Sequence, residues 1–342
     1  MKLITDYGTP YELSVVARAG AADQEREQNK LSAVLPVENV GGTTITLESS
    51  SEGRVEVAEY RAWDAETTFG STDARGRRQI VELAPLGQQA RVSEYDQLTQ
   101  RNANTPERVR NAIGNQALRL GRAVADRLEY ARGEVLQTGK LSINENGFIA
   151  DVDFGRDPSM TTTAATSWAD PTTDWASELS DWMDAYVDLN GELPGGIIAG
   201  NKAIQAMKKA DIFSKIVAGA DAVYKPRATT QDIQDFLTAE GLPTITQYDR
   251  KVRKGGQSVD VVDPNTIIFV PQAALAAGST AMGTTLESYS PDYGIAPGEE
   301  AGIVVGGYQS HNPMGLYLNA AAIGLPVLHD ANRFMAAKII TG

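Results

Sequence analysis

The longest regular pattern in the sequence is helical and covers residues 105–138. Apolar residues recur there at intervals of three and four, which places them in one stripe along an α-helix: Val109, Ile113, Ala117, Leu120, Val124, Leu128, Ala131 and Val135. Thr105 is a suitable N-cap, Pro106 suits the first helical position, and Gly139 follows the last turn. We therefore predict an uninterrupted helix roughly 50 Å long.

Two glycines interrupt the otherwise favourable composition of this helix. Gly114 and Gly121 lie one heptad apart at the edge of the apolar stripe, and each costs about 1 kcal/mol relative to alanine. We propose that they allow close packing or a bend of the helix; the alternative is tolerated sequence drift. The opposite face carries Arg108, Arg119, Arg122 and Asp126 and is expected to face solvent.

Residues 43–91 alternate in the manner of β-strands, at 43–47, 55–60 and 80–84. A glycine-containing, highly charged stretch separates the last two. Such a two-stranded excursion has no core of its own, so we predict an intermolecular contact arm, with a mobile surface hairpin as the alternative. The candidate contact residues are acidic on one arm and basic on the other: Asp64, Glu66, Arg75, Arg77 and Arg78.

The N-terminal 40 residues have too little apolar surface to fold alone and must lie on something. They contain a short helical piece at 11–19, a charged piece at 22–30 and an apolar piece at 31–36. After the long helix, Asn144–Gly147 separates two strand patterns at 140–143 and 148–154, which predicts a hairpin.

The second half of the chain mixes helices and strands. It begins near residue 174 with an amphipathic helix whose apolar face holds Trp175, Leu179, Trp182, Met183 and Tyr186. Strands are predicted at 196–199, 244–248 and 266–270, and a helix at 230–240 ends before Gly241. Two strands, 314–323 and 334–340, close the chain. The predicted fold class is α+β.

Composition narrows the function classes. The 342 residues contain no cysteine, which excludes disulfide and thiolate chemistry, and no apolar run is long enough to cross a membrane. The formal net charge of −13 argues against tight nucleic-acid binding, because that affinity comes from neutralising phosphates.

A search for catalytic, cofactor or metal motifs predicts no such residue. His311 and His329 both lie in turn sequences, and we interpret them as solvent-exposed turn histidines rather than bases or ligands. One acidic run could hold a carboxylate pair or a metal, but we assign it to the solvated face of the helix near residue 174: Asp170, Asp174, Glu178, Asp181, Asp184, Asp188 and Glu192.

Several stretches resemble one protein family. LSAVLP at 31–36, AEYRAWDAE at 58–66 and RVSEYD at 91–96 resemble the N-terminal part of major capsid proteins from phages of actinobacteria. ADVDFGR at 150–156 and the closing residues 316–340 are similar to the lambda-type capsid family. The order of these blocks carries the resemblance, and residues 174–300 contribute little to it.

The resemblance implies the Hong Kong 97-type capsid fold of tailed bacteriophages, and with it a domain plan. The plan comprises an N-terminal arm (1–42), an E-loop (43–90), a P-domain (91–173, with the spine helix at 105–138, and 306–342) and an A-domain (174–305). It further implies self-assembly into the pentamers and hexamers of an icosahedral head around double-stranded DNA.

The same resemblance sets expectations for partners and place. These are further copies of the chain, a separate scaffolding protein, a portal and a decoration protein, with only weak, non-specific contact to packaged DNA and none to a membrane. The protein would reach the virion after assembly in the host bacterial cytoplasm. Some shells of this fold are joined covalently through an E-loop lysine, and this chain has no lysine between Lys30 and Lys140.

Two alternatives stay open at this point. An encapsulin-type nanocompartment shell would share the fold, although such chains are usually shorter and begin with a helix rather than a long arm. An acidic cytosolic α+β enzyme would need catalytic motifs that we do not find in the sequence.

Overall fold

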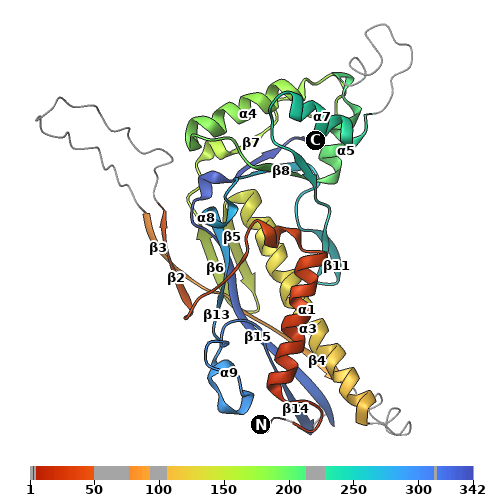
Figure 1. The fold of residues 1–342 in the computed structure, drawn as a ribbon, viewed down its shortest axis with the longest axis vertical. Coiled ribbons are helices and arrows are strands. Elements are labelled where there is room, and N and C mark those ends of the chain that lie inside the picture. The colour runs from red at the N-terminus through yellow and green to blue at the C-terminus, as the bar shows by residue number, and fades with distance from the viewer. Residues whose placement is uncertain are drawn as a thin grey trace, which may run out of the picture.

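A computed structural model describes residues 3, 5–49, 77–92, 106–212, 228–311 and 314–341. The molecule is elongated and has two bodies stacked along its long axis (Figure 1). One body combines two long helices with a five-stranded sheet, and the other is a second five-stranded sheet covered by shorter helices.

The long helix predicted from the sequence is confirmed as α3 (Pro106–Thr138). Ile113, Ala117 and Leu120 of its apolar stripe are buried. The chain leaves the helix through Gly139, whose φ of 68° is the left-handed conformation that glycine adopts without strain. The proposed N-cap at residue 105 lies outside the described residues.

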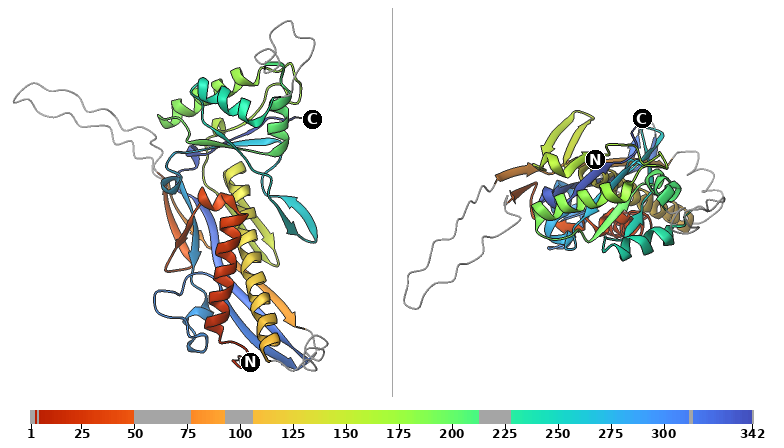
Figure 2. Two further views of the ribbon diagram at one scale, coloured as in Figure 1. Left: turned by 45° about the vertical axis from the view of Figure 1, so that its right-hand side comes forward. Right: turned by 90° about the horizontal axis from the view of Figure 1, so that it is seen from above.

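The N-terminal segment differs from its prediction. A single helix, α1 (Pro10–Glu27), runs through both the helical and the charged piece, and Thr9 with Glu12 forms a capping box at its start. It lies beside α3 of the same chain (Figures 1 and 2). The charged half is helical because Gln24 and Glu25 bind side chains of α3, a contact that local pattern does not encode.

The first sheet is built around β15 (Met314–Leu328). β4 (Pro85–Val92) pairs with one edge of β15, from Leu316↔Val92 to Ile323↔Pro85. β14 (Val304–His311) and β13 (Gly278–Gly283) share the other edge, and β1 (Val37–Asn39) adds to β13 in parallel. Helices α1 and α3 cover one face, where a shared core includes Leu13, Leu120 and Leu318.

The second sheet has the order β7-β16-β12-β8-β9. Its strands are β7 (Thr161–Thr163), β16 (Met335–Lys338), β12 (Thr266–Val270), β8 (Gly196–Ala199) and β9 (Ile245–Gln247). Its helices are α4 (Trp175–Asn190), α5 (Asn201–Lys209) and α7 (Thr230–Ala239). The apolar face predicted for α4 is buried, and Trp168, Trp175 and Trp182 pack together in the core.

Strands that follow one another in the sequence do not always belong to the same sheet. Both closing strands predicted from the sequence form, but they do not pair with each other: β15 belongs to the first sheet and β16 to the second. Likewise β13 leaves the region of the second sheet and joins the first. Each body therefore combines strands from distant parts of the chain. The domain boundaries implied by the resemblance stay a prediction.

Three two-stranded hairpins extend from this framework. They are β2 (Thr44–Ser49) with β3 (Arg77–Glu82), β5 (Lys140–Glu145) with β6 (Phe148–Asp153), and β10 (Lys251–Lys254) with β11 (Gln257–Asp260). The predicted hairpin at 144–147 is confirmed, with positive φ at Asn146 and Gly147 as its two-residue turn requires. The strand predicted at 55–60 lies outside the described residues.

Short helical turns complete the described part of the chain: η1 (Lys30–Ala33), η2 (Pro158–Met160), α8 (Ala274–Ala277), α9 (Leu286–Tyr289), η3 (Pro291–Tyr293) and η4 (Ala331–Arg333). In the described part of the chain, no helix is both long and apolar enough to cross a bilayer.

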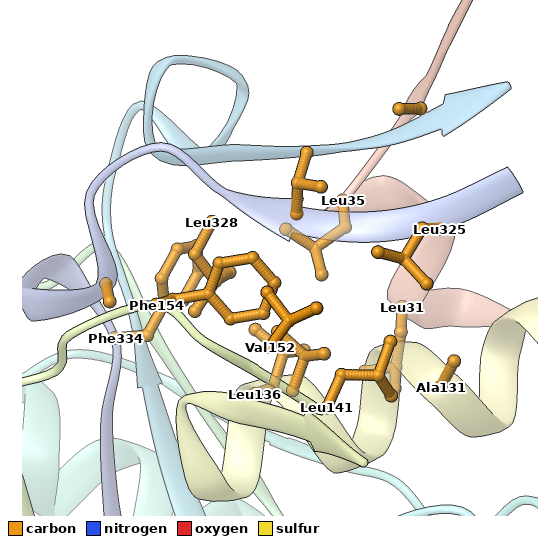
Figure 3. Close-up of a cluster of buried hydrophobic side chains, with 14 of the residues drawn as sticks. Leu31, Leu35, Ala131, Leu136, Leu141, Val152, Phe154, Leu325, Leu328 and Phe334 are labelled. Carbon is orange, nitrogen blue, oxygen red and sulfur yellow. The ribbon is translucent and has the colours of Figure 1, made fainter. Parts of the chain in front are cut away.

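A third core joins the two bodies (Figure 3). Leu31 and Leu35, which follow α1, are fully buried among Leu136, Leu141 and Phe334. Burying a leucine contributes about 1.5–3 kcal/mol. The segment after α1 is thus an integral part of the subunit core.

Candidate functional site

The β2–β3 hairpin carries the described part of the predicted contact arm. Its strands leave one side of the body (Figure 2) and pair with each other from Thr44↔Glu82 to Ser49↔Arg77. Arg77 and Arg78 therefore lie on β3 at the outer end of this pairing, and Arg78 is exposed. The remaining three candidates, Asp64, Glu66 and Arg75, lie outside the described residues.

The two faces of this hairpin have different surroundings. Leu47 and Val81 point into the core that joins the two bodies and are buried. Ile80, on the other face, is 69% exposed. The base of the hairpin is therefore anchored in its own subunit, while its outer face presents an apolar side chain to solvent.

The two candidate glycines of the spine helix, Gly114 and Gly121, have different surroundings in the structure. A Cβ at Gly121 would lie 1.9 Å from the carbonyl oxygen of Ala17 in α1, which is impossible without moving that helix. A Cβ at Gly114 would meet no atom of the described residues within 4 Å. Gly121 thus permits the close approach of α1 and α3, whereas Gly114 makes no such contact with the described residues.

Sequence reasoning missed the matching glycine on α1. A Cβ at Gly20 would lie 2.8 Å from the carbonyl oxygen of Leu118, so the close approach depends on glycine in both helices. The spacing of Ala17, Gly20 and Ala21 on one face of α1 was the available signal.

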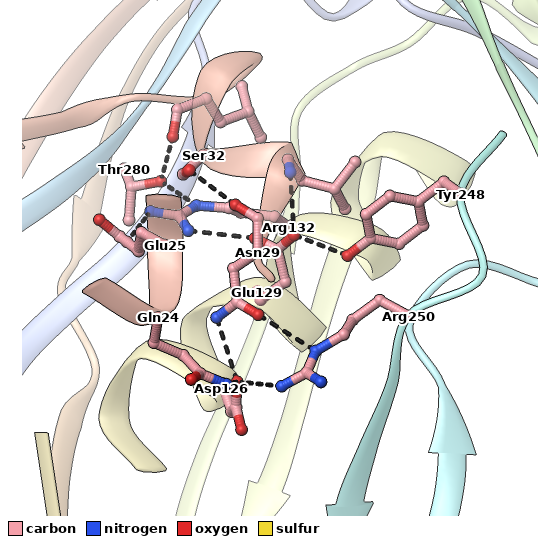
Figure 4. A network of polar contacts seen from close by, with 12 residues as sticks. Gln24, Glu25, Asn29, Ser32, Asp126, Glu129, Arg132, Tyr248, Arg250 and Thr280 are labelled. Atoms are coloured by element: carbon pink, nitrogen blue, oxygen red, sulfur yellow. Dashed lines mark hydrogen bonds and ion pairs between the residues drawn. The ribbon is translucent and has the colours of Figure 1, made fainter. Parts of the chain in front are cut away.

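A buried ion pair lies directly beyond this helix contact (Figure 4). The side chains of Glu129 and Arg132, both on α3, are fully buried and lie 3.2 Å apart. Arg132 also donates to Glu25 of α1 (2.9 Å) and to the hydroxyl of Thr280 on β13 (2.8 Å). The guanidinium therefore ties α1 and the first sheet to the spine helix.

Glu129 is the acceptor at the centre of the network. It accepts hydrogen bonds from the hydroxyl of Tyr248 (2.6 Å) and from the backbone N–H of Leu31 (2.9 Å). Burial raises the pKa of Glu129, and the hydrogen bond from Tyr248 and the charge of Arg132 offset part of that increase. Burial, together with the nearby Glu129, also raises the pKa of Tyr248.

Asp126 was expected on the solvent-facing side of the helix, but its carboxylate instead lies in a second network one helical turn earlier. Asp126 accepts from Gln24 (3.0 Å) and Asn29 (3.1 Å) of the N-terminal segment, and from Arg250 (3.0 Å), which lies just before β10. Both networks therefore connect three parts of the chain: the N-terminal helix, the spine helix and the segment entering the β10–β11 hairpin. This is a structural joint, with every central charge paired.

The acidic run at 170–192 has structural roles, in agreement with the solvated-face interpretation for most of its members. Asp174 caps α4, and Glu192 binds Arg333 (3.0 Å). Glu178 differs, because it accepts hydrogen bonds from the indole of Trp168 (2.6 Å) and the backbone of Ala165 (2.7 Å). Over the described residues, no group of three His, Cys, Asp or Glu side chains could hold a metal ion.

The side chain of His329, predicted to be a solvent-exposed turn residue, instead contacts Ser279 and Glu38. Its Nε2 lies 3.1 Å from the hydroxyl of Ser279, which donates to Glu38 (2.8 Å). In a nucleophilic triad the acid would orient the histidine through the ring nitrogen that faces away from the serine. Here the carboxylate and the serine face the same nitrogen, so the geometry fixes β1 against β13 rather than activating a nucleophile. The side chain of His311 lies outside the described residues.

Comparisons with known proteins identify the family of the chain. The model of a family described as phage major capsid protein E matches residues 31–339. A comparison with curated proteins finds no match.

Two solved structures share the fold. A protein assigned as a prophage capsid protein of E. coli CFT073 matches with a TM-score of 0.65 at 13% identity, covering 99% of this chain and 100% of that one. A phage-related protein of Bordetella bronchiseptica RB50 matches with a TM-score of 0.60 at 12% identity, covering 95% and 96%.

The family match extends from the third core through both sheets to the last strand, so it spans nearly all of the architecture described above. The structural matches independently confirm the α+β capsid fold that the resemblance implied. The chain therefore belongs to the phage major capsid protein E family and is a structural protein of the phage virion.

Proposed function

We propose that this major capsid protein self-assembles into the pentamers and hexamers of an icosahedral phage head that encloses double-stranded DNA. Assembly would take place in the host bacterial cytoplasm with a separate scaffolding protein, and the finished head would carry a portal and a decoration protein. The family assignment supports self-association as the basis of this role.

The observation that carries the proposal is the β2–β3 hairpin. Within the described residues its two strands pair only with each other, and Ile80 on the outer face is 69% exposed. An isolated two-stranded hairpin is marginally stable in water and gains stability when its free face is covered. A neighbouring subunit would supply that cover, which is the role expected of an E-loop.

The charge of the chain fits a shell around DNA. A lining that neutralised many phosphates would hold DNA tightly, with an affinity that falls steeply with salt. A net charge of −13 favours weak, non-specific contact instead. The packaged DNA would then remain free to move along the inner surface.

Electron microscopy and sedimentation of the purified native protein test the proposal. We expect megadalton icosahedral shells of phage size. A small, cargo-loaded shell would favour the nanocompartment alternative, and a discrete small oligomer would overturn the proposal.

Hydrogen exchange adds a test of the hairpin itself. Amides of β2 and β3 should exchange more slowly in the shell than in the dissociated subunit, because the neighbour covers the outer face of the hairpin. Amides in the middle of α3 serve as the control, since they should be protected in both states.

A further inference from the structure

A groove of about 940 Å³ lies on the side of the spine helix where four elements meet. Its walls come from α3, the first half of β4, the turn of the β5–β6 hairpin and the turn of the β10–β11 hairpin. Residues far apart in sequence therefore shape one continuous depression, which the described part of the subunit leaves open.

The groove holds more positive than negative side chains. Arg127 and Lys254 both bind one carboxylate, Glu145, at 3.4 and 2.9 Å. The hydrogen bond from Lys254 lowers the pKa of Glu145, which keeps it ionised. Both cations also lie over the ring of Tyr130, at 5.7 and 4.6 Å from its centroid, so their positions are constrained.

Two further charged residues line the groove. Arg253 is exposed on β10, and Asp126 already binds Arg250 at 3.0 Å. Three cations therefore line the groove, namely Arg127, Arg253 and Lys254. Of the two lining carboxylates, Asp126 is bound to Arg250, and only Glu145 faces these cations. On a chain with a net charge of −13, this local excess leaves the remaining surface more acidic still.

The floor and one wall suit a polypeptide. Val124, Ile143 and Val252 are buried apolar residues that reach the groove. β4 pairs with β15 along one edge, and the described residues place no strand on its other edge, next to the groove. A free strand edge offers N–H and C=O groups to an extended segment, while apolar side chains provide pockets for it.

We propose that this groove is an inter-subunit contact that receives an extended, acidic segment of a second copy of the chain. The inference rests on the proposed self-assembly. Charge favours a second copy, because each copy carries a net negative charge outside this groove. A contact between a groove and a different surface is heterologous, and heterologous contacts close into rings such as pentamers and hexamers. An apolar floor and a strand edge would contribute little to binding a phosphate backbone.

Two charge reversals on the same strand test the contact. Arg253→Glu changes a residue that lines the groove, and Lys251→Glu changes one that lies outside it and binds Asp260 at 3.1 Å. Both alter the net charge equally on β10. We expect Arg253→Glu to raise the subunit concentration required for assembly about tenfold, as for the loss of one favourable contact, and Lys251→Glu to leave it within about twofold.

Hydrogen exchange on DNA-free wild-type shells identifies the occupant. The amide of Gly87, which points away from β15 in this register, should exchange more slowly in these shells than in the dissociated subunit, while the amides of Leu86 and Gln88, which face β15, serve as the internal control. Protection only in DNA-filled particles would assign the groove to nucleic acid and overturn the proposal.

The remaining outcomes separate this contact from the proposed function. Shells with an unprotected Gly87 amide, or equal assembly of the two variants, would overturn the contact alone. A wild-type protein that never forms shells would overturn the proposed function and the contact with it.

Discussion

Replacing Gly121 by alanine tests the contact between the N-terminal helix and the spine helix. The added Cβ would lie 1.9 Å from the carbonyl oxygen of Ala17, so α1 must move outward by about 1.5 Å to restore a normal contact. Overpacking of this kind costs about 1–3 kcal/mol. The movement also stretches the hydrogen bonds from Gln24 to Asp126 and from Arg132 to Glu25, and bonds to charged groups contribute about 1.5–3 kcal/mol each.

Helix propensity acts in the opposite direction. Alanine is better than glycine in a helix by about 1 kcal/mol, so we expect Gly121→Ala to destabilise the subunit by about 2–4 kcal/mol. Gly114→Ala is the matched control, with the same substitution one heptad earlier on the same helix and no atom of the structurally described segments within 4 Å of the new Cβ. It should stabilise the subunit by up to about 1 kcal/mol.

Urea unfolding of the dissociated subunits, followed by far-UV circular dichroism, measures the difference. The midpoint should shift down for Gly121→Ala and up for Gly114→Ala relative to the wild type. Equal midpoints for the two variants would refute the close approach of α1 and α3. Normal maturation of Gly114→Ala shells would in addition rule out a bending role for that glycine.

Four further predictions concern the buried network and the predicted E-loop. Glu129→Ala should destabilise the subunit by about 3–5 kcal/mol in urea, because it removes the carboxylate that pairs with the fully buried Arg132; a loss below about 1 kcal/mol would contradict this. Since the folded-state pKa of Glu129 is raised from 4.5, its contribution to stability should fall as pH rises above 4.5, a slope that Glu129→Gln should abolish in pH-dependent unfolding. Shells should dissociate to single 36.6 kDa chains in boiling SDS, because the E-loop contains no lysine for a covalent link, and a ladder of bands would refute this. Replacing Arg75, Arg77 and Arg78 of the E-loop by glutamate should leave a folded subunit that fails to form shells. A normal shell yield by electron microscopy would show that these charges are not needed for assembly.

Local pattern alone was enough to predict the elements whose burial is periodic. The stripe of α3 and the aromatic face of α4 each specify a helix, because side chains three and four residues apart lie on the same face. The turn at Asn146 and Gly147 specifies a hairpin, because those residues accept positive φ. The order of these blocks was also sufficient to indicate the capsid family.

Which surface each element packs against was decided by the tertiary structure. Glu25 and Arg132 are 107 residues apart, Asn29 and Arg250 are 221 apart, and no local rule relates them. For the same reason the sequence predicted two closing strands but not their separate sheets, and two glycines but not that only Gly121 contacts another helix. Periodicity shows that a face is buried, whereas the partner that buries it depends on chain topology. The helix α1, the buried network and the groove all depend on such distant partners, so they become visible only in the folded chain.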